Sequence, residues 1–149
     1  MEEIIISAIA LAVSFFAAIF SIFTHVSTVK RDRKQATLDA YNLLQEQVFD
    51  KIVLIPPSEI KEIAKNSRSE KYKEVSGYLA RIEHFCVGVN MKIYDFNTFY
   101  ELAHGFFDGR VKNRLEPMLE SKQKSTDNYY NNISKVLSQM KARSKSKKD

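Results

Sequence analysis

The stretch IIISAIALAVSFFAAIFSIF, residues 4–23, decides the fold of this chain, because it contains no charged side chain over its whole length. An α-helix rises about 1.5 Å per residue, so about 20 residues cross the ~30 Å hydrocarbon core of a bilayer. The uncharged stretch continues to Val29, with His25 as its one titratable side chain. We therefore expect a transmembrane anchor over residues 1–29.

A cleaved signal peptide is the competing interpretation of this stretch. Such a peptide begins with basic residues, has a shorter apolar run and ends in a small-x-small cleavage site. Here Glu2 and Glu3 precede the apolar run, and no convincing Ala-x-Ala motif follows Phe20. The sequence therefore favours a helix that stays in the membrane.

Four basic residues directly follow the apolar stretch, and we call them the basic collar: Lys30, Arg31, Arg33 and Lys34. Because basic residues flanking a membrane helix mark its cytoplasmic end, we expect the N-terminus outside and the C-terminal domain in the cytoplasm. The same side chains suit the anionic surface of a bilayer, which is the first partner that the sequence indicates. The expected location is the inner (plasma) membrane of a cell.

Small residues recur every three or four positions along the apolar stretch. We call five of them the small-residue seam: Ser7, Ala10, Ser14, Ala17 and Ser21. In lipid, small residues let helix backbones approach closely, so van der Waals packing can drive association. The seam therefore predicts a helix–helix interface in the membrane and a homo-oligomer, although the abundance of Ala and Ser in this segment is an alternative explanation.

The rest of the chain reads as a small bundle of helices. With only 4 Gly, 3 Pro and no Trp, the composition favours helices. Helical spacing continues from the basic collar to about Leu54, which predicts a stalk helix. We expect a short helix over about 58–66, capped by Ser58, and a longer one over about 69–91. A further helix should begin after a cap at Asp95, and the last one at Pro117. The predicted domain organisation is an anchor at 1–29, a cytosolic helical domain at 30–142 and a disordered basic tail at 143–149.

Few polar residues of the predicted domain suggest chemistry. Glu83 lies beside apolar neighbours on its helix, so we expect a partly buried carboxylate hydrogen-bonded to an Arg, Lys or Tyr. We interpret Cys86 as a small buried hydrophobic residue. His84 and His104 lack metal-ligand spacing, and we expect no metal and no cofactor.

The sequence indicates a binding protein and not an enzyme. It contains no Gly-rich phosphate loop, nucleophile elbow or paired-carboxylate motif. The basic C-terminus fits anionic lipid or simple solubilisation; it lacks the interleaved aromatic residues that would favour nucleic acid as a partner.

The run RIEHFCVGVNMKIYD, residues 81–95, resembles a family of uncharacterised bacterial membrane-anchored helical proteins. The shared pattern is a glutamate, a Val-Gly pair and a Tyr-Asp helix start. The resemblance implies a bacterial inner-membrane protein. We expect a single-pass, membrane-tethered interaction or scaffolding protein that self-associates and has a further, unidentified protein partner. The alternative is a membrane-acting effector that perturbs the bilayer, as in bacterial defence.

Overall fold

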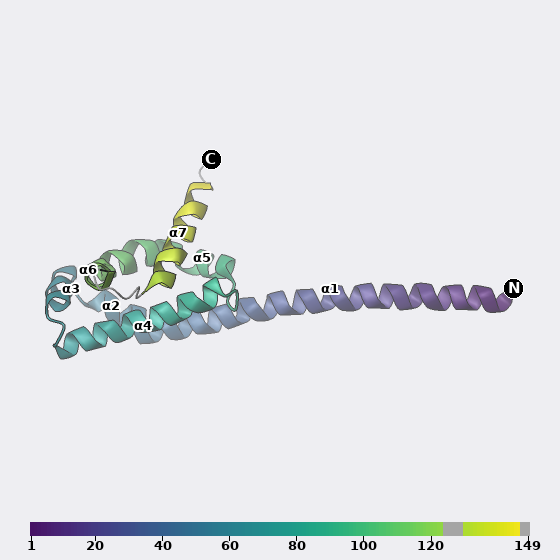
Figure 1. Ribbon diagram of the computed structural model, residues 1–149, viewed down its shortest axis with the longest axis horizontal. Coiled ribbons are helices and arrows are strands. Elements are labelled where there is room, and N and C mark those ends of the chain that lie inside the picture. Colours follow the sequence, from purple (N-terminus) through teal and green to yellow (C-terminus); the bar gives the residue numbers. More distant parts are fainter. Residues whose placement is uncertain (124–129, 147–149) are drawn as a thin grey trace.

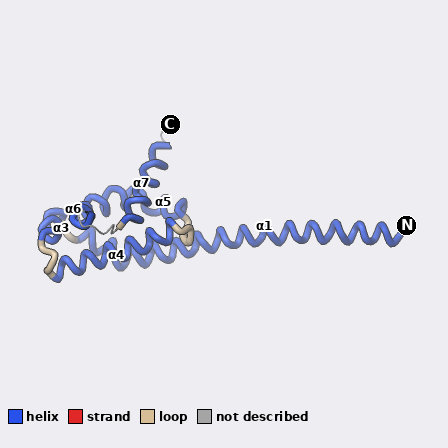
Figure 2. Tube along the Cα trace, in the orientation of Figure 1, coloured by secondary structure: helices blue, strands red, loops and turns tan. Residues whose placement is uncertain are grey.

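The computed structural model of the protein describes residues 1–123 and 130–146, and every element within these ranges is a helix (Figure 2). In chain order the elements are α1 (Glu2–Leu44), η1 (Gln45–Phe49), α2 (Asp50–Leu54), α3 (Pro57–Lys65), α4 (Glu70–Asn90), α5 (Phe96–Gly105), η2 (Phe106–Val111), α6 (Lys112–Gln123) and α7 (Asn131–Ser146). The segments η1 and η2 are single π-helical turns. The all-α prediction is confirmed.

The first three elements form one continuous helix, Glu2–Leu54, which is long and apolar enough to cross a membrane by length and composition. Its N-terminal half projects alone from the domain (Figure 1), and none of its apolar window is buried. Burial begins only at Thr37, followed by Tyr41 and Leu44. The predicted apolar helix that runs unbroken into a stalk is confirmed.

Two prolines end the long helix and start the next one. Ile55 is extended, with φ −82° and ψ 122°, and α3 begins at Pro57. Proline is favoured at the first helical position because its missing N–H would have no partner there. The predicted cap at Ser58 is wrong, since the chain is already helical at this residue and Pro56 occupies the cap position.

Helix α5 begins at the predicted cap Asp95, and α4 begins after Ser69, close to the predicted start of that helix. Ser69 Oγ accepts the N–H of Tyr72 at 3.1 Å, and Asp95 Oδ1 accepts the N–H of Thr98 at 2.8 Å. The ring of Tyr94 stacks on Phe85, with centroids 5.0 Å apart, and Phe85 contacts Phe99. Phe85 thus joins the ring of Tyr94 to that of Phe99 at the start of α5.

Pro117 does not open a helix, and this prediction is wrong. Elements α5, η2 and α6 follow one another without a break, and Pro117 lies inside α6. A proline in a helix interior costs about 3 kcal/mol. Burial of Val111, Leu115 and Met118, each worth about 1.5–3 kcal/mol, offsets that cost and keeps the helix intact.

The last helix is longer than expected. It buries Ile133, Val136 and Met140 and runs on to Ser146. A disordered tail from Arg143 is therefore wrong for residues 143–146, because the Arg143 guanidinium lies 4.6 Å from the Tyr100 ring centroid and is paired with Glu101. Residues 147–149 of the predicted tail lie outside the described residues.

The core forms where the C-terminal part of the long helix packs against α4, α5 and η2 (Figure 1). Helix α7 covers α4, and α6 packs against α3. Aromatic rings fill the centre: Phe49 of η1 contacts Phe106 and Phe107 of η2, with centroids 5.5 and 6.0 Å apart. The two π-helical turns therefore meet at the middle of the domain.

Candidate interaction surfaces

The small-residue seam lies entirely on the exposed, projecting half of α1. Within it, Ser14 Oγ donates a hydrogen bond to the carbonyl of Ala10 at 2.9 Å. A short side chain whose hydroxyl is satisfied by its own helix presents a low surface that a second helix can approach closely. The described part of this chain covers no residue of the seam, so the interface that we predict there remains open to a partner.

The basic collar follows on the same helix, and its four residues are exposed. The Asp95 carboxyl lies at the end of the domain nearest the projecting half of α1, where it interacts electrostatically with Lys34 of the collar. Burial alone would raise the pKa of Asp95, but hydrogen bonds from Thr98 and the positive charges of Lys34 and Arg143 outweigh burial and hold that pKa below its usual range. Asp95 therefore stays ionised and keeps its role as the cap of α5.

Thr37 connects α1 to the turn between α4 and α5. Its hydroxyl is fully buried, donates to the carbonyl of Arg33 at 2.7 Å and accepts the N–H of Asp95 at 2.7 Å. No local sequence pattern marks Thr37 for this role, because 58 positions separate it from Asp95 along the chain. The contact fixes the α4–α5 turn beside the basic collar.

Glu83 is half-buried and caps the N-terminus of α7 from a different helix. Its Oε1 accepts the N–H of Asn132 at 3.0 Å and the Asn132 side-chain amide at 2.7 Å, while Oε2 accepts the N–H of Ile133 at 3.0 Å. The first N–H groups of a helix lack partners within it and favour a negative charge. Glu83 is hydrogen-bonded as predicted, but the expected Arg, Lys or Tyr partner is wrong.

Gly88 allows Tyr94 to fold back over α4. A Cβ atom at position 88 would lie 2.5 Å from Cε2 of the Tyr94 ring, which is closer than side chains pack. The Gly88 carbonyl also accepts the N–H groups of Ile93 and Tyr94, at 2.9 and 3.1 Å. Glu83, Gly88 and the Tyr94–Asp95 pair of the run at 81–95 therefore all have structural roles.

We expect Gly88→Ala to lower the free energy of unfolding by about 1–3 kcal/mol, because the added methyl displaces a packed ring. Gly77→Ala, on the same helix, is the matched control: among the described residues nothing lies within 4 Å of its added Cβ. The control should gain about 0.5–1 kcal/mol from the better helix propensity of alanine. Pulse proteolysis of the full chain in lipid nanodiscs, across a urea series, measures both, and stabilisation by both substitutions would refute the packing argument.

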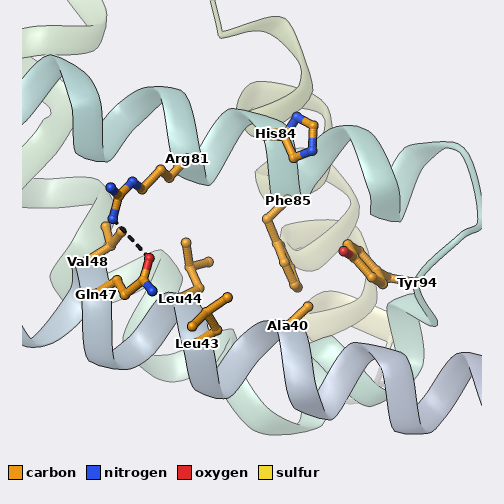
Figure 3. A pocket seen from close by; sticks show the side chains of 9 residues that line it. All are labelled: Ala40, Leu43, Leu44, Gln47, Val48, Arg81, His84, Phe85 and Tyr94. Carbon is orange, nitrogen blue, oxygen red and sulfur yellow. Dashed lines mark hydrogen bonds between the residues drawn. The ribbon is translucent and has the colours of Figure 1, made fainter.

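A groove of about 220 Å³ lies between the long helix and α4 (Figure 3). Arg81 Nη1 closes one end by donating to Gln47 Oε1 at 3.0 Å, and Leu43 is 54% exposed at its edge. The lining is otherwise mostly apolar: Ala40, Leu44, Val48, His84, Phe85 and Tyr94. Such a surface can hold an apolar side chain of a partner, with Arg81 and His84 available for polar contacts.

The remaining candidates for chemistry lie in structural positions. His104 stacks on Tyr100, with centroids 4.6 Å apart, whereas His84 lines the groove. Burial, and to a lesser extent the Glu83 charge, raises the pKa of the Cys86 thiol, which stays protonated at neutral pH as a small buried residue. Within residues 1–123 and 130–146, no group of three His, Cys, Asp or Glu side chains could hold a metal ion.

In the part of the chain that the structure describes, these features define an all-α protein with one candidate membrane helix that is continuous with a compact helical domain. The family described as "Domain of unknown function (DUF4760)" matches residues 8–140, and the chain belongs to this family. The match covers most of the projecting part of α1 and nearly all of the domain. The predicted membership of an uncharacterised family is confirmed. Comparisons with curated proteins and with solved structures find no match.

Proposed function

We propose that the protein is a single-pass membrane scaffold of the inner (plasma) membrane, which self-associates through α1 and holds its helical domain at the cytoplasmic surface. The observation that carries the proposal is the projecting half of α1, none of whose apolar window is buried. Leaving such side chains in water is costly, whereas a bilayer solvates them fully. The basic collar at the end of the uncharged stretch supports a cytoplasmic domain.

The phase of the long helix supports self-association. Ala10, Ser14 and Ala17 of the seam each precede by 27 residues one of the three buried residues of α1: Thr37, Tyr41 and Leu44. At 3.6 residues per turn, 27 residues correspond to about 7.5 turns, so the seam faces roughly opposite the side that carries the domain. Two copies can therefore pack along the seam without a collision between their domains.

The groove supports a role in binding a further protein. It lies on the helical domain and combines an apolar lining with Arg81 and His84 (Figure 3). The alternative, an effector that perturbs the bilayer, receives less support, because the Ser14 hydroxyl and the Thr24 hydroxyl both donate to carbonyls of their own helix. Hydroxyls that already donate to their own helix have less hydrogen-bonding capacity left for water or ions that would cross the membrane.

The seam is tested by replacing Ser14 and Ala17 together with leucine. We expect the double substitution to reduce crosslinking of the full chain to near background, because leucine keeps the helix backbones apart. The matched control, Ala8→Leu with Ala12→Leu, makes a similar change on roughly the opposite face and should leave association intact. Single cysteines in a Cys86→Ala background should crosslink strongly at positions 10, 14, 17 and 21 and weakly at 15, 16 and 19.

Three measurements separate the possible failures of this proposal. All variants should remain in the membrane fraction after carbonate washing, and release of the native chain would refute the anchor itself. Crosslinking without periodicity, or association of the Ser14/Ala17 variant at the native level, would refute the seam. Loss of membrane potential when the native chain is overproduced would favour the effector over the scaffold.

A further inference from the structure

We propose that the α4–α5 turn, residues 91–94, is a second membrane contact, whose apolar side chains enter the headgroup layer of the bilayer that α1 spans while Lys92 binds anionic lipid phosphates. The inference rests on the proposed function, since α1 must cross the membrane for the turn to face it. It adds a specific lipid-binding surface on the folded domain, separate from the anchor.

The fold places this turn at the membrane end of the domain. Figure 1 shows the turn between α4 and α5 at the end from which the projecting half of α1 emerges. The hydrogen bond between Thr37 Oγ1 and the Asp95 N–H holds it there at 2.7 Å. Thr37 is eight residues beyond Val29, about 12 Å along the helix, and a headgroup layer is roughly 5–7 Å thick. The turn therefore lies just outside this layer, within reach of long side chains.

The length of the uncharged stretch brings the turn closer to the bilayer. Residues 4–29 form a helix about 39 Å long, whereas the hydrocarbon core is about 30 Å thick. A helix longer than the core accommodates the excess by tilting. The domain lies to one side of α1 (Figure 1), so a tilt toward that side lowers the turn into the headgroup layer.

The side chains of the turn have the chemistry of an interfacial contact. Met91 and Ile93 are 67% and 55% exposed and flank Lys92. The neighbouring basic collar adds positive charge on the same side, which an anionic leaflet attracts. Apolar side chains beside basic ones are the combination that binds the boundary between headgroups and acyl chains.

The backbone at Lys92 gives a second reason to assign a role to this lysine. Its φ is 60°, in the left-handed region where glycine is favoured after a helix C-terminus. A lysine here costs stability, which a contact made by its side chain would explain. Lys92→Gly therefore separates a structural role from a membrane role. If Lys92 stabilises the fold, the glycine variant should lose stability; if Lys92 binds lipid, the variant should gain stability and lose membrane contact.

The test uses the full chain with Cys86→Ala and Ile93→Cys, labelled with an environment-sensitive fluorophore and reconstituted in nanodiscs that contain headgroup-nitroxide lipids. We expect strong quenching at position 93, greater with phosphatidylglycerol than with phosphatidylcholine alone. Leu54→Cys is the matched control: Leu54 is also apolar and is 81% exposed, but it lies at the far end of the long helix. Its label should be quenched little in either lipid.

Lys92→Gly should raise the midpoint of urea unfolding. It should also lower the equilibrium constant for contact with the anionic disc about fivefold, because one basic residue near an anionic surface contributes about 1 kcal/mol. Equal quenching at positions 93 and 54 in a chain that resists carbonate washing would overturn the second contact and leave the proposed function intact. A Lys92→Gly variant with unchanged quenching would overturn the role of Lys92. A chain that fails to insert would overturn both proposals.

Discussion

Phe49→Ala is expected to lower the free energy of unfolding of the helical domain by about 3–5 kcal/mol, the range for removing a fully buried phenylalanine. The ring is 0% exposed and contacts Tyr41, Phe106 and Phe107. These neighbours belong to the long helix and to η2, so the cavity would open where the two π-helical turns meet. Pulse proteolysis of the nanodisc-held chain in urea measures the change.

Leu54→Ala is the matched control for this prediction. Leu54 belongs to the same continuous helix but is 81% exposed, so its truncation should change the free energy of unfolding by no more than about 0.5 kcal/mol. A loss below about 1 kcal/mol for Phe49→Ala would show that η1 and η2 do not pack through this ring.

Glu83→Ala is expected to cost about 2–3 kcal/mol and to loosen α7 selectively. The substitution removes a charged acceptor from three hydrogen bonds and leaves the N–H groups of Asn132 and Ile133 without that partner. Hydrogen exchange should therefore accelerate most in the first turn of α7. Glu83→Gln keeps one acceptor oxygen and loses the charge, so about 1 kcal/mol is expected.

The contrast between the two Glu83 variants distinguishes capping from packing. If the glutamate acts only by filling space, the glutamine variant should behave like the native chain in both stability and exchange. Uniform acceleration of exchange across the whole domain, without a maximum at α7, would contradict the capping role. Glu74→Ala is a control on the exposed side of α4 and should leave α7 unchanged.

Features encoded within a few successive residues were predictable from the sequence. The uncharged run at 4–29 predicted the projecting helix, and the absence of Gly and Pro up to Leu54 predicted its unbroken continuation. Asp95 predicted the start of α5, because its cap bond reaches only three residues along the chain. Cys86 was correctly placed in the core from the apolar spacing of its helix.

Features that depend on distant residues were not predictable in this way. A proline is typical of a helix start, and the burial of Leu115 and Met118, which accounts for an unbroken α6 at Pro117, is not visible in the local sequence. The cap of α7 comes from Glu83, 49 residues earlier than its partner Asn132. The composition of the tail predicts disorder from Arg143, whereas α7 continues there because Arg143 contacts Tyr100 on a separate helix. The π-helical turns likewise carry no local signature in their residues.

The separation of 27 residues between the seam and the buried face of α1 has a consequence for valency. In the pair that we propose along the seam, the two domains would point away from each other, and each would carry its own groove. A target whose two binding segments are joined by a linker long enough to span both domains could occupy both grooves, and its second attachment would be intramolecular and governed by effective concentration. Pairing in the bilayer would thereby convert a weak single contact into avidity, without any change in the groove itself.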